Sequence, residues 1–224
     1  MPAAANHFYY DVAHLLGALV LLCSFVLIYQ RRLTGIINAF TMQSLALALA
    51  AAWQAFVQDA PHLFVTAGIA LLFKTVTVPV ALHWIVRRLA IHETVENALG
   101  IGLSLLSGVG LVALAVLLVL PVTGSTAALT RETLAMALSI LLLGLLIMIA
   151  RRNAIAQVVG FMSLENGLVL AAVGVKGMPL VVEMSVAFSL LVAFILFGLF
   201  FFRIRERFDT LDLQFVESFR GERR

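Results

Sequence analysis

The chain has 224 residues, of which 62% are hydrophobic and only 12% are charged, and its mean hydropathy is +1.08. Because about a quarter of the residues of a soluble domain are charged, this composition excludes a soluble globular protein. The net charge of +3 comes from arginines in short loops and at the C-terminus, where membrane topology explains them better than nucleic-acid binding does. The sequence therefore predicts an all-α, polytopic integral membrane protein that binds no nucleic acid.

Seven apolar runs reach the length of about 20 residues that a helix needs to cross the hydrocarbon core of a bilayer. They predict membrane-spanning helices at residues 12–30, 34–57, 62–86, 98–120, 133–150, 153–174 and 180–202. No lysine or arginine precedes the first run and no small-residue cleavage site follows it, so we expect a retained helix rather than a signal peptide. The connections are short, apart from residues 121–132.

The basic residues are distributed unevenly between the loops. Twelve arginines fall in alternate loops and in the C-terminal tail, against Arg131 and Lys176 in the opposite loops. Lysine and arginine are enriched on the cytoplasmic side of membrane proteins. We therefore expect a cytoplasmic C-terminus and, with an odd number of spans, an external N-terminus.

Two charged side chains fall deep within the predicted spans. Lys74 lies about 18 Å into the third span, and Glu165 lies about 13 Å from the outer end of the sixth, at a rise of about 1.5 Å per residue. A charge at the bilayer centre costs about 3 kcal/mol on insertion scales, so Glu165 is expected to face the protein interior. If the two spans are neighbours, Lys74 and Glu165 can form a buried ion pair, which either exchanges protons or only holds the helices together.

Further polar residues lie near these two along the chain. Pro79 follows Lys74 by five residues and favours a local break of the helix. His83 falls on the opposite face of an ideal helix from Lys74, and is either an interfacial residue or part of a proton relay. Glu183 lies only about 6 Å deep, so it is either a second relay carboxylate or the salt-bridge partner of Lys176.

The fourth span begins with candidate capping and packing residues. Glu93 and Glu96 precede it, where negative charge suits a helix N-terminus; proton entry or contact with a partner is the alternative. Gly100, Ser104 and Gly108 recur every four residues and predict a close contact between helices. The second span also carries polar residues, for which hydrogen bonding between helices is the favoured role. These residues are Asn38, Thr41, Gln43, Ser44 and Gln54.

Four segments stand out by their order and spacing. They are YQRRLTGIINAF after the first span, the charged third span GIALLFKTVTVPVALHWIVRRL, and the late segments RRNAIAQVVGFMSLENGLVLAA and GMPLVVEMSVAFSLLVAFILFG. In this order they resemble component E of hydrogenase-4, a membrane subunit of complex I-like, group 4 NiFe-hydrogenase assemblies. The resemblance covers essentially the whole chain and implies a multi-pass subunit of a prokaryotic inner membrane.

The last three spans also resemble subunit K of respiratory complex I and its counterpart in Mrp antiporter systems. In that family, an arginine-bearing turn comes before two helices that each carry a buried glutamate. RRN at Arg151 to Asn153 matches the turn, and Glu165 and Glu183 match the two carboxylates. The resemblance implies three regions: a four-helix region at 1–130, a subunit K-like three-helix region at 131–203, and a short cytoplasmic tail at 204–224.

The function implied by the resemblance is that of a non-redox membrane-arm subunit with no catalytic centre, metal or cofactor of its own. Glu165 and Glu183 are expected on a proton or sodium pathway, and Lys74 and His83 join them as candidates from their positions in the third span. Nickel–iron and iron–sulfur centres are expected in partner subunits, which include antiporter-like subunits. A purely structural linker subunit is the alternative, and an independent transporter is disfavoured because no inverted repeat is evident.

Overall fold

The computed structural model describes residues 2–88, 95, 98–122 and 128–174. The chain divides into two units, Met1–Val186 and Ala187–Arg224, and every described residue lies in the first. Within this described part, all regular elements are helical, which confirms the all-α prediction. The predicted seventh span at 180–202 lies outside the described residues.

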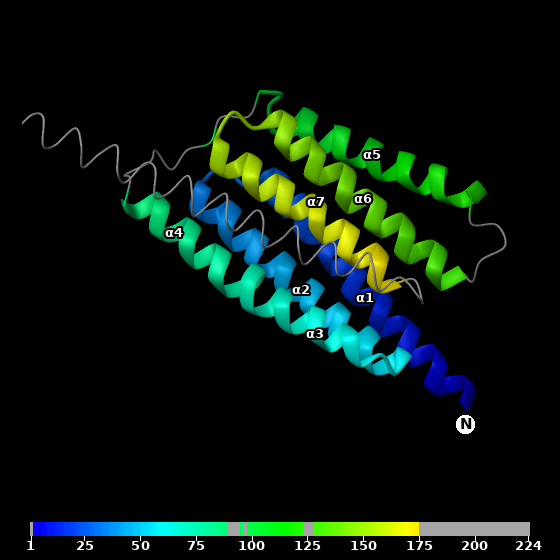
Figure 1. Ribbon diagram of the computed structural model, residues 1–224. Coiled ribbons are helices and arrows are strands. Elements are labelled where there is room, and N and C mark those ends of the chain that lie inside the picture. Colours follow the sequence, from blue (N-terminus) through cyan, green and yellow to red (C-terminus); the bar gives the residue numbers. More distant parts are fainter. Residues whose placement is uncertain (1, 89–94, 96–97, 123–127, 175–224) are drawn as a thin grey trace, which may run out of the picture. The chain divides into compact units, whose positions relative to one another are not determined.

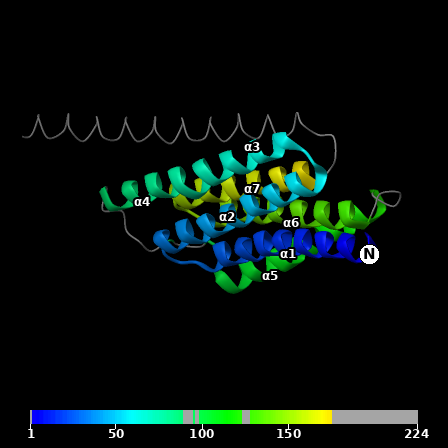
Figure 2. The same cartoon turned by 90° about the horizontal axis from the view of Figure 1, so that it is seen from below.

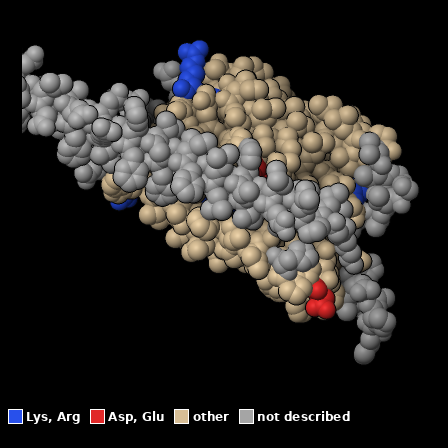
Figure 3. Space-filling model, viewed as in Figure 1, with Lys and Arg blue, Asp and Glu red and all other residues tan. Residues whose placement is uncertain are grey.

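Long helices joined by short connections build the described unit (Figures 1 and 2). In chain order they are α1 (Pro2–Tyr29), α2 (Leu33–Gln58), α3 (Pro61–Ile69), the π-helix η1 (Ala70–Thr77), α4 (Val78–Arg88), α5 (Ile101–Val122), α6 (Ala128–Ala150) and α7 (Ala154–Gly174). The segments α3, η1 and α4 follow one another without a gap. The described residues contain six stretches that are long and apolar enough to cross a membrane. Most of the described surface in Figure 3 is uncharged, as suits side chains that face lipid.

Local sequence explains where several helices begin and end. Asp59 follows α2 in the left-handed conformation, with a φ of 51°, which aspartate adopts more readily than most residues with a Cβ. Pro61 then opens α3 at a position where its missing N–H costs no helical hydrogen bond. Asn153 caps α7, because its Oδ1 accepts the backbone N–H groups of Ile155 at 2.9 Å and Ala156 at 3.3 Å.

The break expected near Pro79 takes the form of the π-helix η1, which ends directly before α4. Proline has no N–H to complete the regular helical pattern. The widened turns let the hydroxyl of Thr77 donate to the carbonyl of Leu72, five residues earlier, at 3.0 Å. Lys74 lies in the middle of η1. Segments of π-helix are rare in proteins and frequently occur at functional sites.

Helix α2 is the most buried of the six candidate spans. It packs against α1, α3, η1, α4 and α7. Of its apolar stretch 61% is buried, against 22% for α5, which packs mainly on α6 and α1. Polar side chains on α2 are therefore placed in the protein interior, whereas α5 offers most of its surface to the surroundings.

Glycines allow the backbones of α6 and α7 to approach each other closely. A Cβ at Gly144 would lie 2.5 Å from the backbone nitrogen of Leu164, and one at Gly167 would lie 2.7 Å from the carbonyl oxygen of Ala137. Backbone atoms cannot move aside as a flexible side chain can, so only glycine fits at both positions. This contact fixes the rotation of α7 next to Glu165.

Gly167→Ala is expected to destabilise the protein by about 1–3 kcal/mol, because overpacking forces the two backbones apart. The matched control is Gly110→Ala on α5, where no atom lies within 4 Å of the added Cβ; alanine is favoured over glycine there by about 0.5–1 kcal/mol. Thermal unfolding in lipid nanodiscs measures both. A Gly167→Ala variant that melts at or above the temperature of the unmodified protein contradicts the close approach of α6 and α7.

The small-residue strip predicted on the fourth span is found partly in contact with other helices. Ser104 is buried, and a Cβ at Gly108 would lie 3.1 Å from the side chain of Leu143 and 3.2 Å from that of Phe25. Gly100 precedes α5 with a φ of +73° and has no atom within 4 Å of its Cβ position. Its conformation at the helix start, rather than contact, therefore accounts for glycine there.

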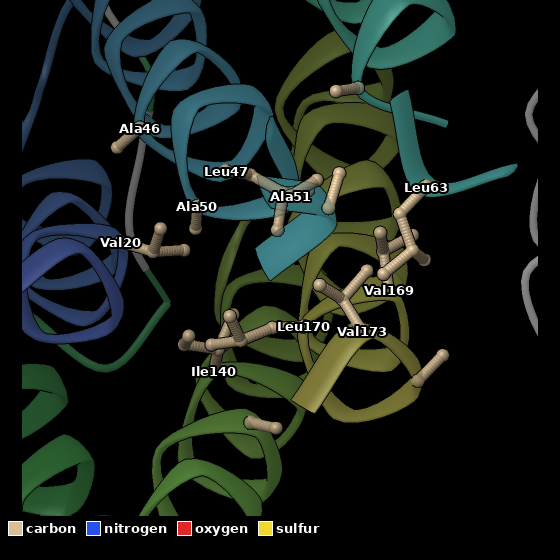
Figure 4. Close-up of a cluster of buried hydrophobic side chains, with 14 residues drawn as sticks. Val20, Ala46, Leu47, Ala50, Ala51, Leu63, Ile140, Val169, Leu170 and Val173 are labelled. Atoms are coloured by element: carbon tan, nitrogen blue, oxygen red, sulfur yellow. The ribbon is translucent and has the colours of Figure 1, made fainter. Parts of the chain in front are cut away.

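A cluster of buried apolar side chains, drawn in Figure 4, joins α1, α2, α3, α6 and α7. It contains many alanines, which let the helices pack closely. Along α2 it begins after Gln43, and along α7 it begins after Asn166. The cluster comprises Val20, Ala46, Leu47, Ala50, Ala51, Ala55, Leu63, Ala67, Ala137, Ile140, Val169, Leu170, Ala172 and Val173. It fills the bundle between the middle of these helices and the end at which α2 and α7 finish.

Candidate functional site

An ion pair between Lys74 and Glu165 lies in the interior of the protein. Lys74 Nζ is 3.1 Å from Glu165 Oε1, and the two side chains are 4% and 1% exposed. Lys74 extends from η1 and Glu165 from α7, two elements that both pack on α2. The ion pair that the similar depths of Lys74 and Glu165 suggested is therefore present. Its role in moving protons stays a prediction.

Asn166 is the second partner of Lys74. Lys74 Nζ donates to Asn166 Oδ1 at 3.0 Å. On its other side, Asn166 Nδ2 donates to Gln43 Oε1 at 3.2 Å and to Ser44 Oγ at 3.4 Å. The ammonium group therefore bridges two neighbouring residues of α7, and Asn166 connects it to α2.

Gln43 carries the network further, to α1 and back to α7. Its Nε2 donates to Ser24 Oγ at 2.7 Å and to Ser163 Oγ at 2.9 Å. The hydroxyl of Ser24 in turn donates to the carbonyl of Val20 at 3.2 Å. The prediction that Gln43 and Ser44 bond between helices is confirmed. We call the buried set the polar network; it comprises Ser24, Gln43, Ser44, Lys74, Ser163, Glu165 and Asn166.

The hydrogen bonds of the polar network share one direction. Lys74 Nζ donates to Asn166, Asn166 Nδ2 donates to Gln43, and Gln43 Nε2 donates to the serine oxygens. Every donor group in this series therefore points away from the ammonium. Asn166 consequently turns its oxygen atom toward the positive charge, and Gln43 turns its oxygen atom toward Asn166. The network is thus built around a cation at Nζ.

Apolar side chains lie on both sides of the polar network along the helices. Toward the ends of α2 and α7 lies the apolar cluster of Figure 4. Toward their beginnings, the buried side chains are again apolar, namely Leu33, Ile36, Ile37 and Phe40 on α2 and Ala156, Val159 and Met162 on α7. The charged pair is therefore enclosed between two apolar layers, where electrostatic interactions are strong.

The other predicted site residues do not join this network within the described part of the chain. His83 Nδ1 contacts the carbonyl of Pro79 at 2.9 Å, within its own helix. Glu93, Glu96 and Glu183 lie outside the described residues. The relay and entry roles given to these four residues stay predictions.

Arg151 lies at the end of the bundle where α1 and α6 finish, and its side chain is buried. Its Nη2 donates to the carbonyl oxygens of Leu27 at 3.3 Å, Ile28 at 2.7 Å and Gln30 at 2.6 Å. The last carbonyls of a helix lack partners within it, and a cation there also interacts favourably with the helix dipole. Burial lowers the pKa of Arg151 from its ordinary value, but a guanidinium stays charged at neutral pH.

Aromatic side chains gather at the opposite end of α1 and α2. Trp53 Nε1 donates to the carbonyl of Tyr9 at 3.1 Å. Phe8, Tyr9 and Phe56 surround the Trp53 ring, with centroids 5.9–6.2 Å from it. Tryptophan and tyrosine are enriched at membrane–water interfaces, so this group is typical of the level at which a span leaves the hydrocarbon core.

Three members of the polar network, Asn166, Ser163 and Ser24, were missed by the sequence reading. The available signal was their type and spacing: Ser163 and Asn166 are three residues apart and so lie on one face of α7. A polar residue within an apolar span usually seeks a partner on another helix. Which helix that is follows only from the packing.

The fold and the polar network define a class: an all-helical membrane protein with an ion pair enclosed among its candidate spans. Comparison with known proteins narrows this class. Over 208 residues the chain is 27% identical to hydrogenase-4 component E of Escherichia coli, covering 92% of this chain and 96% of that protein. It is also 28% identical over 210 residues to an uncharacterised protein of Mycobacterium tuberculosis, covering 91% and 93% of the two chains. No family model and no solved structure matches.

These similarities extend over nearly the full length of both relatives. They agree with the resemblance to hydrogenase-4 component E seen in the sequence, at a distant level of identity. The resemblance of the last three spans to complex I subunit K and its Mrp antiporter counterpart stays a prediction.

Proposed function

We propose that the chain is a non-redox membrane-arm subunit of a complex I-like, membrane-bound NiFe-hydrogenase of the hydrogenase-4 type. In this role, Lys74 and Glu165 belong to a path that moves protons or sodium ions, coupled to electron transfer in partner subunits. The nickel–iron and iron–sulfur centres are located in those partners. The similarity to component E of Escherichia coli supports the assignment to such a complex.

The single observation that carries the ion-moving role is the enclosed pair itself. A charged residue among apolar spans is costly, and such residues usually mark ion paths in membrane proteins. Lys74 and Glu165 are within 3.1 Å of each other, a distance at which a proton can pass directly between two groups. The pair is held by hydrogen bonds that come from three helices, so its geometry is set before any ion arrives.

The proposed topology is seven spans in a prokaryotic inner membrane, with the N-terminus outside and the C-terminus in the cytoplasm. It is supported by the distribution of basic residues between alternate loops. Hydrogen bonds from Val95 N to Arg31 O at 2.8 Å and from Ala98 N to Ala150 O at 2.9 Å bring two of the arginine-bearing turns to one end of the bundle. In this topology that end faces the cytoplasm.

A structural linker between the hydrogenase module and antiporter-like subunits is the second candidate. The observation that favours it is the number of hydrogen bonds that hold Lys74 and Asn166 in place. Buried ionic and polar groups can serve to specify one arrangement of helices. The two candidates share the same partners and differ in whether Glu165 changes its protonation state.

The assignment to a hydrogenase complex is tested by purifying the tagged chain from its native membranes under mild detergent. We expect NiFe-hydrogenase and antiporter-like subunits to co-purify, and deletion of the chain to abolish hydrogen evolution by those membranes. Recovery of the chain alone, as a stable protein that transports ions without partners, contradicts the proposal and favours an independent transporter.

A further inference from the structure

The oxygen atoms around Lys74 form a cation site that the protein fills with its own side chain. Glu165 Oε1 and Asn166 Oδ1 lie 3.1 Å and 3.0 Å from Lys74 Nζ, and all three residues are buried. An ammonium group in contact with a carboxylate and an amide oxygen occupies the position that a small inorganic cation would otherwise take. Any sodium ion at this position must therefore displace Lys74 or bind beside it.

Four further side-chain oxygens of the polar network are engaged as acceptors. Gln43 Oε1 and Ser44 Oγ accept from Asn166 Nδ2 at 3.2 Å and 3.4 Å. Ser24 Oγ and Ser163 Oγ accept from Gln43 Nε2. A hard cation that has lost its water needs several oxygen ligands, and at these four atoms it would compete with the amide donors of Asn166 and Gln43.

Charge also disfavours a second cation at this site. A sodium ion in contact with Glu165 would lie close to the Lys74 ammonium, and repulsion at about 4 Å inside a protein lowers affinity by roughly a thousandfold. Additional carboxylates could offset this repulsion. Across the described residues, however, no group of three or more His, Cys, Asp or Glu side chains could hold a metal ion.

A proton needs no such shell of ligands. Its transfer breaks one Nζ–H bond of Lys74 and forms one Oε1–H bond on Glu165, which converts the ion pair into a neutral amine and a neutral carboxylic acid. Because the pair is neutral overall before and after the transfer, no net charge has to be placed in the enclosed site. Asn166 and Gln43 carry no titratable group, and therefore act as positioning residues for Lys74.

From this geometry we infer that the ion handled at the Lys74–Glu165 site is the proton, and that Lys74 excludes sodium from it. The inference rests on the proposed ion-moving function and names the ion that the function left open. It also explains why Asn166 turns its oxygen atom toward Nζ, since this atom completes the surroundings of a cation that is part of the chain.

Sodium binding by the full chain in lipid nanodiscs tests the inference directly. With millimolar ²²Na⁺ we expect the unmodified protein to retain no more sodium than the Glu165→Gln variant. Saturable binding of one sodium ion per chain that Glu165→Gln removes would overturn it. Absence of saturable binding to the unmodified protein supports the inference even where the variant fails to fold.

A second measurement uses native membrane vesicles that contain the complete complex. Proton uptake during hydrogen turnover is expected to be equal in sodium-free choline buffer and in sodium buffer. Uptake that stops in choline and returns on addition of sodium contradicts the inference, even if Glu165 is required for transport. Conversely, unchanged transport in Glu165→Gln contradicts the proposed function, so the two failures are distinguishable.

Discussion

Lys74→Met is expected to lower the free energy of unfolding by about 3–5 kcal/mol, because removing one partner of a buried ion pair leaves a charge without compensation. Methionine has a similar length and keeps the apolar stem, so the change isolates the loss of the ammonium group. Glu165 loses its contact at 3.1 Å and Asn166 loses the donor at 3.0 Å. Reversible unfolding in mixed micelles, with SDS as denaturant, measures the change.

The double variant Lys74→Met/Glu165→Leu distinguishes the contribution of the ion pair to stability from that of its surroundings. When both partners of a buried pair become apolar, stability is often retained, so we expect at least half of the loss to be recovered. Arg152→Met is the control for removing a positive charge at an exposed position, where the effect should stay within about 0.5 kcal/mol. A double variant no more stable than Lys74→Met contradicts the ionic coupling of the two residues.

Glu165→Gln is expected to slow ion movement strongly while the complex still assembles. Glutamine has the same shape and can still accept a hydrogen bond from Lys74, but it cannot take up a proton. Proton transfer by a positioned group contributes about 10²–10⁴-fold to a rate, so proton uptake by membrane vesicles should fall by at least about tenfold. Hydrogen evolution by the same vesicles reports assembly of the electron-transfer partners.

The matched control for this change is Glu132→Gln. The Glu132 side chain is 58% exposed and lies 2.9 Å from His14 Nε2, so its replacement also removes a carboxylate from a contact with another side chain, but not from the polar network. Proton uptake in Glu132→Gln should equal that of the unmodified complex. Full uptake in both variants would support the structural linker and refute the relay.

The sequence was sufficient to find the two charged members of the site. Hydropathy located six spans close to their observed bounds, because long apolar runs have few alternatives in a membrane protein. Comparable depth then made Lys74 and Glu165 candidate partners. Their actual contact depends on η1 and α7 both packing on α2, and one sequence gives no measure of which spans are neighbours.

Residues whose role depends on helix rotation were harder to predict. The sequence indicated a close contact at Gly100, Ser104 and Gly108, whereas the tightest backbone approach involves Gly144 and Gly167 between α6 and α7. Both sets are small residues in or beside apolar helices, so spacing alone does not distinguish them. Only the packed structure shows which glycine meets a backbone.

Arg151 shows the same limit for a charged residue. In the sequence, Arg151 is a loop arginine that supports the topology, and nothing distinguishes it from its neighbour Arg152. In the structure Arg151 is buried against three carbonyl groups at the end of α1, while Arg152 is exposed. Two adjacent arginines in one turn thus have different roles, and the difference arises from a helix more than 120 residues away in the sequence.

Infrared difference spectroscopy of the purified complex during hydrogen turnover tests most directly whether Glu165 changes its protonation state. We predict a carboxylic acid C=O band that appears or disappears with turnover in the unmodified complex and is absent from Glu165→Gln. The Glu132→Gln complex should retain the band. Identical difference spectra for the unmodified and Glu165→Gln complexes would contradict a proton relay through the Lys74–Glu165 pair.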